Sequence, residues 1–226
     1  DGVLSTEEVS HWKSVGLFFH SYWYMELISR FGDVPWVDEI ITDSSEERFM
    51  ARTPRDEVAS NILERLIWAE ENIGSSDKDG DNPVTRDCIR VLLSRFGLRE
   101  GTWRKYHGLG DAEKYLQACI KYSELLMADY PTLYQGVAND KGEPVPGAGY
   151  GELWTTRDLA GVPGVIFFKR IVGEVNPHRF SDYEHIAAHN YEMPQHTVDM
   201  YLCQDGKTIS NSAQYQFGPE NRNIHA

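Results

Sequence analysis

Four histidines fall in the second half of the chain: His178, His185, His189 and His196. His185 and His189 are four residues apart, a spacing that places two imidazoles on one face of a helix, where they can bind zinc. The glutamate that acts as general base in helical zinc proteases is missing, because Ile186 holds its position. No third ligand is set by spacing. We therefore expect loop or surface histidines and no metal site.

A run of acids, Asp77-Lys78-Asp79-Gly80-Asp81, resembles the start of a calcium-binding EF-hand loop. The rest of the loop does not fit. Asn82 stands where the loop needs glycine, and Cys88 stands where it needs a bidentate glutamate. We expect a solvated turn between two helices, with a calcium site of another kind, built on one or two of these acids, as the alternative.

Aromatic residues make up 12% of the chain, and several lie outside helical periodicity among polar neighbours. Such rings can stack on the C–H face of a sugar while nearby polar groups bind its hydroxyls. The candidate ligand-binding residues are Trp154, Phe180, Tyr183 and Trp36. The alternative is that these rings, with Tyr191, pack as a lid over a small local core.

Trp154 is the first candidate because its segment, Gly151–Asp158, holds two threonines, an arginine and acids. That mixture suits a ring that stacks on a sugar and polar groups that hold the hydroxyls. The tryptophans of the helical segments are instead expected to fill the core or a groove: Trp12, Trp23, Trp68 and Trp103. Trp103 in particular is predicted to be largely buried.

Catalytic motifs are missing from the sequence. It contains no glycine-rich phosphate loop, no Gly-x-Ser-x-Gly elbow and no Cys-x-x-Cys pair. Carboxylates are plentiful, but the separation that would define a glycosidase pair is a property of the fold. Nothing in these residues therefore compels an enzyme, and no cofactor is expected.

The charge balance excludes another class of function. The 226 residues carry 22 Lys and Arg against 35 Asp and Glu, a net charge of −13. A nucleic-acid-binding protein needs a basic surface to replace phosphate counterions, so no nucleic-acid partner is expected.

Capping signals and apolar periodicity predict four helices between Ser5 and Tyr130. The first begins at the capping box Ser5-Thr6-Glu7-Glu8 and ends at Gly32, and the second begins with Thr53 as N-cap and Pro54 at its first position. Two more follow, the last with Asp111 as its cap. The stripe expected to be buried in the first helix is Trp12, Val15, Phe19, Tyr22, Trp23, Leu27 and Phe31. For the second helix it is Val58, Ile62, Leu66, Ala69 and Ile73.

The chain changes character after residue 130. Most of its prolines lie beyond that point, and helical periodicity is scarce. We predict tetratricopeptide-like helical hairpins over 1–130 and a loop-rich ligand-binding region, packed on the helices, over 131–226. Within it, 165–170 is a candidate buried strand, 196–203 a short helix and Asp205-Gly206 a turn.

The chain begins at Asp1 without an initiator Met or an apolar leader, and we expect this start to lie inside a longer gene product. No apolar run approaches the ~20 residues that cross a bilayer. The three cysteines are expected to be buried thiols.

Four stretches together resemble the SusD/RagB family, the surface glycan-binding lipoproteins of Bacteroidetes nutrient uptake systems. They are Tyr24–Trp36 (YMELISRFGDVPW), Arg52–Val58 (RTPRDEV), Glu100–His107 (EGTWRKYH) and Val198–Lys207 (VDMYLCQDGK), and they occur in the family's order.

The resemblance implies a mainly α fold, a tetratricopeptide-like superhelix of helical hairpins that carries an irregular glycan-binding region. It implies non-catalytic capture of oligosaccharide or polysaccharide and delivery to a SusC-like TonB-dependent transporter. It also implies a surface-exposed lipoprotein of the outer membrane, whose lipid anchor is absent from this chain. The chain would then be one SusD-like domain, incomplete at both ends. Sugar-contacting residues vary within the family, so none is carried over.

A second hypothesis is a helical glycoside hydrolase or lyase with a carboxylate pair that the sequence does not reveal. A third is a scaffold whose helical hairpins present a groove to a protein partner.

Overall fold

The computed structural model describes residues 4–75, 79–136, 138–139, 141–143, 145, 148–156, 158–171 and 194–215. The chain divides into two compact units, Asp1–Lys169 and Arg170–Ala226. Within the described ranges the regular structure is helical, and extended segments pair in two isolated bridges, Val34–Thr53 and Leu202–Thr208. The predicted mainly α fold class is confirmed, while the superhelix and the domain boundary after residue 130 stay predictions.

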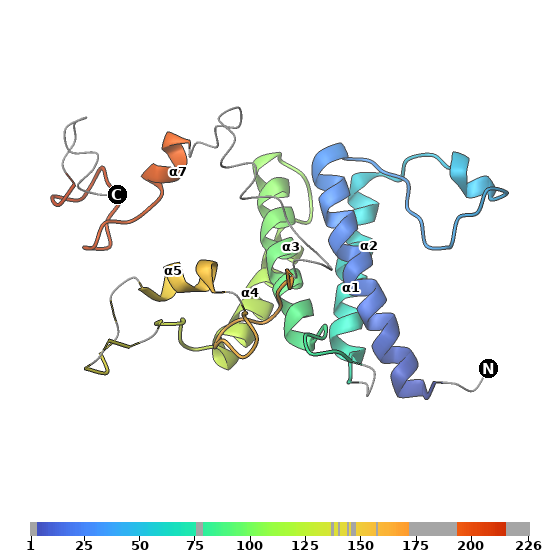
Figure 1. Ribbon diagram of the computed structural model, residues 1–226. Helices are drawn as coiled ribbons and strands as arrows, with labels where there is room; N and C mark the ends of the chain where they lie inside the picture. The colour runs from blue at the N-terminus through green and yellow to red at the C-terminus, as the bar shows by residue number, and fades with distance from the viewer. Residues whose placement is uncertain are drawn as a thin grey trace, which may run out of the picture. The chain divides into compact units, whose positions relative to one another are not determined.

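The first unit contains four long helices: α1 (Thr6–Phe31), α2 (Arg55–Asn72), α3 (Arg86–Tyr106) and α4 (Ala112–Asp129). Consecutive helices run in opposite directions and pack against each other, and α1 also contacts α3 (Figure 1). This confirms the four predicted helices and their packing as antiparallel hairpins. No helix in the described ranges has both the length and the apolar content needed to cross a membrane.

The predicted ends of α1 are confirmed. The Ser5 hydroxyl accepts a hydrogen bond from the Glu8 amide at 3.2 Å, and the Glu8 carboxylate accepts one from the Ser5 amide at 2.9 Å. Gly32 ends the helix at φ 70°, in the left-handed region that favours glycine.

The predicted buried stripe of α1 is wrong. The residues that face the core are His11, Ser14, Phe18, Ser21, Tyr24, Met25 and Ile28. Trp23, at the centre of the predicted stripe, is 62% exposed, and four other members are exposed with it: Phe19, Tyr22, Leu27 and Phe31. Apolar residues recur at helical spacing on both faces of α1, so periodicity cannot select one. The buried Ser14 and Ser21 make the inner face look polar in the sequence.

The second helix follows its prediction more closely. All five residues of its predicted stripe are buried. The start lies one residue later than expected, because Pro54 occupies the cap position and Thr53 instead pairs with Val34. A carboxylate from the preceding loop takes over the cap, since Asp33 Oδ1 accepts from the Arg55 amide at 2.9 Å. The loop between the bridged residues contains one turn of 3₁₀ helix, η1 (Glu46–Phe49).

Two glycines on α3 allow α4 to approach closely. A Cβ atom on Gly97 would lie 2.6 Å from the Tyr115 carbonyl oxygen, and one on Gly101 would lie 2.7 Å from the Leu116 side chain. Asp111 precedes α4 in the left-handed region at φ 60° and makes no capping hydrogen bond with its side chain, contrary to prediction. The fourth helix is therefore positioned by backbone contact with α3.

A buried charge network joins α2 to α3. Glu100 is 1% exposed, and its carboxylate accepts two hydrogen bonds from Arg55 and one from Arg104, each at 2.7 Å. Arg104 also donates to Asp56 at 2.8 Å, and its guanidinium lies 4.8 Å from the centre of the Tyr115 ring. Burial raises the pKa of Tyr115 to about 12. All the charges of this network are paired, as a buried ionic cluster requires.

The prediction that Trp103 is largely buried is wrong, because its side chain is 44% exposed. The ring covers the outside of the charge network instead of the core. The Arg55 guanidinium lies 5.0 Å from its centre, and the His107 ring stacks on it at 3.9 Å.

The segment expected to be a strand, 165–170, forms no ladder. The Asn82 side chain donates to the Phe168 carbonyl, and the Cys88 thiol lies 3.9 Å from the Ile166 carbonyl oxygen. Side chains of other segments thus hold this stretch, and the predicted strand is not formed. All three cysteines are free thiols, and only Cys88 is fully buried.

The second unit contains α7 (Gln195–Asp199), shorter than the predicted 196–203 helix and shifted by one residue. The predicted turn at Asp205-Gly206 is confirmed. The Cys203 amide donates to the Lys207 carbonyl at 2.8 Å, the Gly206 amide donates to the Cys203 carbonyl at 2.8 Å, and Gly206 has φ 72°.

Candidate functional site

The first candidate residue, Trp154, lies on a helix, where the sequence predicted a loop. It belongs to α5 (Ala148–Thr155) and is 75% exposed. Tyr150, one turn earlier, is 62% exposed, and the two ring centres lie 5.9 Å apart with the planes at 65°. Sequence reasoning missed Tyr150, although the i, i+4 spacing on a short helix would have indicated it. The two rings form an open aromatic platform.

The opposite face of α5 is held by the chain before it. A Cβ atom on Gly149 would lie 2.5 Å from the Tyr134 carbonyl oxygen, so the backbones touch here. The Tyr134 hydroxyl donates to Glu152 at 3.1 Å. Gly149 and Glu152 occupy the inner face of the helix, and this orientation leaves Tyr150 and Trp154 toward solvent.

The polar groups expected around Trp154 are partly engaged. The Thr155 hydroxyl donates to the Gly151 carbonyl at 3.0 Å, and the Thr156 hydroxyl donates to the Glu152 carbonyl at 2.6 Å. Asp158 accepts from the Ala160 amide at 3.0 Å, and Arg157 lies outside the described residues. Hydroxyl oxygens keep acceptor capacity when they donate, so both threonines can still accept a hydrogen bond.

Trp36 lies in the loop between α1 and α2, where it belongs to a packed cluster of side chains. Its ring centre lies 4.4 Å from that of Tyr24 and 5.0 Å from that of His20, and the Arg65 guanidinium lies 4.7 Å from it. The indole N–H donates to Asp38 at 2.9 Å. Trp36 is half-buried and packs against the core, so these contacts occupy much of its surface.

A polar pocket adjoins this cluster. It has a volume of about 500 Å³ and is lined by Lys13, Leu17, Asp38, Glu64, Arg65 and Trp68. Burial acts to raise the pKa of Asp38, but hydrogen bonds from Arg65 and Trp36 outweigh it and hold that pKa below its ordinary value. The Lys13 ammonium lies 4.2 Å from the centre of the Trp68 ring. The pocket combines an aromatic wall with hydrogen-bond donors and acceptors, the combination that a hydroxylated ligand requires.

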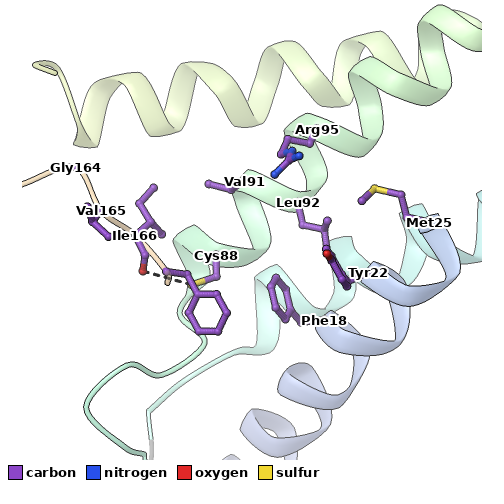
Figure 2. Close-up of a pocket in the computed structure, with 11 residues that line it drawn as sticks. Phe18, Tyr22, Met25, Cys88, Val91, Leu92, Arg95, Gly164, Val165 and Ile166 are labelled. Atoms are coloured by element: carbon purple, nitrogen blue, oxygen red, sulfur yellow. Dashed lines mark hydrogen bonds between the residues drawn. The ribbon is translucent and has the colours of Figure 1, made fainter. Parts of the chain in front are cut away.

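A second pocket, of different chemistry, lies between α1, α3 and the 164–167 segment (Figure 2). Its volume is about 390 Å³. Apolar side chains from both helices form its walls, and Arg95 supplies a positive charge. No candidate residue predicted from the sequence lines it.

Several predicted residues lie outside the described part of the chain: Asp77, Lys78, His178, Phe180, Tyr183, His185, His189 and Tyr191. The ligand-binding assignments of Phe180 and Tyr183 therefore stay predictions. His196 lies on α7, beside a polar pocket of about 470 Å³ in the second unit. Among the described residues, no three of His, Cys, Asp and Glu are grouped as metal ligands.

Comparison with known proteins gives one local match. The chain is 35% identical over 106 residues to SusD-like protein P2 of Formosa agariphila. The match covers 46% of this chain and 21% of that protein, so the chain spans about a fifth of the relative's length. No protein-family model matches the chain, and no solved structure matches it. The similarity suggests a relationship to SusD-like proteins over part of the chain, in agreement with the four stretches quoted above.

Proposed function

We propose that this protein captures oligosaccharide or polysaccharide at the cell surface without cleaving it. The observation that carries the proposal is the 35% identity to a SusD-like protein over 106 residues. The four family-like stretches support the same assignment, as does the exposed aromatic platform on α5. The bound glycan would pass to a SusC-like TonB-dependent transporter.

The platform supports binding of a sugar chain. Tyr150 and Trp154 present two large rings to solvent at a centre-to-centre distance of 5.9 Å. A ring of this kind buries the apolar C–H face of a sugar and leaves the sugar hydroxyls in water. Because both rings are largely exposed, the platform suits an extended chain better than a single enclosed monosaccharide.

Trp36 is assigned an indirect part in this proposal. Its indole N–H holds Asp38, and Asp38 lines the polar pocket with Glu64 and Trp68. Sugar hydroxyls can donate to the two carboxylates, while Lys13 and Arg65 can donate to hydroxyl oxygens of the same ligand. The pocket would then be a second glycan contact, supported by Trp36 from behind.

The cellular location is proposed from the same similarity to a SusD-like protein. We propose a surface-exposed lipoprotein of the outer membrane in the full gene product. Fractionation of cells that express the full-length protein should place it in the outer membrane, and affinity purification should recover the transporter. A cytoplasmic location would contradict both the localisation and the transporter partner.

The binding proposal is tested with a panel of oligosaccharides and polysaccharides. A ligand is first found by retardation in polysaccharide gels and its affinity is measured by titration calorimetry. Trp154→Ala and Tyr150→Ala should each weaken binding by about tenfold, the loss of roughly 1.4 kcal/mol from a stacking contact. Phe180→Ala and Tyr183→Ala test the two candidates outside the described residues.

Trp23→Ala is the matched control, because Trp23 is also an exposed helical tryptophan but lies on α1. It should bind like the parent. Equal affinity of the parent, Trp154→Ala and Tyr150→Ala would remove the α5 platform from the site. Glycan fragments that appear on incubation, and vanish when a carboxylate is mutated, would favour a hydrolase or lyase.

A further inference from the structure

The apolar pocket of Figure 2 is bounded by three different segments of the first unit. Phe18 and Met25 come from α1, and Val91 and Leu92 come from α3. The third wall is the segment 164–167. With a volume of about 390 Å³, the pocket lies in the size range of small-molecule sites.

The third wall is held in place by specific contacts. The Phe167 ring meets the Phe18 ring edge to face, with centres 6.1 Å apart. The Cys88 thiol lies 3.9 Å from the Ile166 carbonyl oxygen, and Asn82 donates to the Phe168 carbonyl. The segment is therefore fixed against the helices on both sides of the pocket.

Arg95 is the charged residue of the pocket and differs from the other arginines near it on α3. Arg90 donates to Glu70, Asp87 and Asp129, and Arg99 pairs with Glu26 at 3.5 Å. Arg95 has no ion pair or hydrogen bond within the part of the chain that the structure describes. Figure 2 shows it at the edge of the pocket, beyond Val91 and Leu92 on the same helix. Arg95 is exposed, and among the described residues its guanidinium has no acidic partner beside the apolar pocket, although the chain carries a net charge of −13.

We propose that the pocket binds a small amphiphile, a free monocarboxylic acid with an unbranched alkyl chain. The alkyl chain would fill the space between Phe18, Met25 and Leu92, where it leaves water for an apolar surface. The carboxylate would accept two parallel hydrogen bonds from the Arg95 guanidinium, the strongest geometry for this pair. A sugar does not fit these walls, because most of its hydroxyls would be buried without partners. The proposal is independent of glycan capture on α5.

The test follows the Met25 methyl group by NMR, with 13C-labelled methionine methyl groups in the full chain and Met25→Leu to assign the signal. Decanoate is the probe, and decanol and decyltrimethylammonium share its alkyl chain with a neutral or positive head group. Decanoate should shift the Met25 signal saturably and bind about tenfold more tightly than decanol, the gain from one charge-assisted contact. The cationic amphiphile should bind most weakly.

Variants of this pocket separate its charge from its shape. Arg95→Gln should lower the affinity for decanoate to that for decanol and leave decanol binding unchanged. Arg48→Gln, in η1, removes an arginine that does not line the pocket and should change neither. Val91→Phe should fill the space and block both ligands while circular dichroism shows the parent's helix content. Absence of a saturable Met25 shift, equal affinity for the three head groups, or full decanoate affinity in Arg95→Gln would each overturn the proposal.

Discussion

The α2–α3–α4 junction and the α5 platform place polar and aromatic groups in opposite environments. At the junction, Glu100 is almost fully buried and three hydrogen bonds from Arg55 and Arg104 satisfy it. On α5, Tyr150 and Trp154 point to solvent and their rings meet each other. Residues at the junction are paired with each other in the interior, whereas the two rings on α5 are exposed to solvent.

Two of the four family-like stretches meet at this junction. Arg55 and Asp56 belong to one stretch, and Glu100 and Arg104 belong to another, and the fold brings the two together as one ionic network. These two stretches therefore contribute to the packing of α2 against α3. The α5 platform lies in a part of the sequence without such a stretch.

Breaking the ionic network around Glu100 should cause the largest loss of stability. Glu100→Ala leaves Arg55 and Arg104 facing each other in a buried site, and we expect a loss of about 3–5 kcal/mol in the free energy of unfolding. Urea denaturation measures it. Trp154→Ala is the matched change on α5 and should stay within about 0.5 kcal/mol of the parent. Similar losses in the two variants would contradict the division of roles.

A side chain placed in the close contact between α3 and α4 should cause the next largest loss of stability. A Cβ atom at Gly97 would lie 2.6 Å from the Tyr115 carbonyl oxygen and 2.8 Å from the Cys119 amide nitrogen, and backbone atoms cannot move aside cheaply. Gly97→Ala should therefore destabilise the protein by about 1–3 kcal/mol.

Gly16→Ala is the control for this variant. Gly16 lies inside α1 with nothing within 4 Å of its Cβ position, so alanine should stabilise the helix by roughly 0.5–1 kcal/mol. The two Gly→Ala changes are thus expected to shift the denaturation midpoint in opposite directions. A shift in the same direction would show that α4 can move away from α3.

Trp103 tests the outer edge of the junction. A fully buried tryptophan would cost about 3–5 kcal/mol on truncation. Trp103 is half-exposed and mainly covers Arg55 and His107, so Trp103→Ala should cost about 1 kcal/mol, as expected for a partly exposed cation–π contact. A loss near that of Glu100→Ala would mean that the ring supports the network more strongly than its exposure indicates.

The Trp36–Asp38–Arg65 cluster is intermediate in burial between the junction and the α5 platform. A change of charge there should have the smallest effect on the free energy of unfolding. The pKa of Asp38 is lower in the folded protein than its ordinary value. The stabilisation that the Asp38 carboxylate contributes to the folded protein is therefore fully present above the unfolded pKa of about 3.9. It is lost as the pH falls through the folded pKa. Because the carboxylate is partly exposed, this contribution should be below about 1 kcal/mol. Asp38→Asn should be slightly less stable than the parent at pH 7, and the difference should disappear in acid. A difference that persists at low pH would point to a cause other than the charge of Asp38.

Much of the fold was predictable from local signals. The capping box at Ser5 and the positive φ of Gly32 are properties of short peptide segments, and they gave the correct ends of α1. The stripe on α2 was correct because that helix has one clear apolar face. The predicted buried stripe on α1 was wrong because α1 is apolar on two faces. Only contact with α2 and α3 decides which face is buried.

The candidate site was less predictable. Trp154 was identified from its neighbours in sequence, but its partner Tyr150 and its place on a helix depend on the contact of Gly149 with Tyr134. The Arg95 pocket was missed altogether. Its walls come from residues near 20, 90 and 165, and no local pattern relates segments so far apart.

The sequence by itself determined the four long helices and their approximate ends, because capping and backbone propensity act over three or four residues. It also determined the acidic charge balance and the stretches that resemble SusD-like proteins. The tertiary structure alone decided which face of α1 is buried, which charges meet at Glu100, and which rings remain in water. Burial and charge pairing depend on distances between residues far apart in the chain, and those distances exist only once the helices have packed.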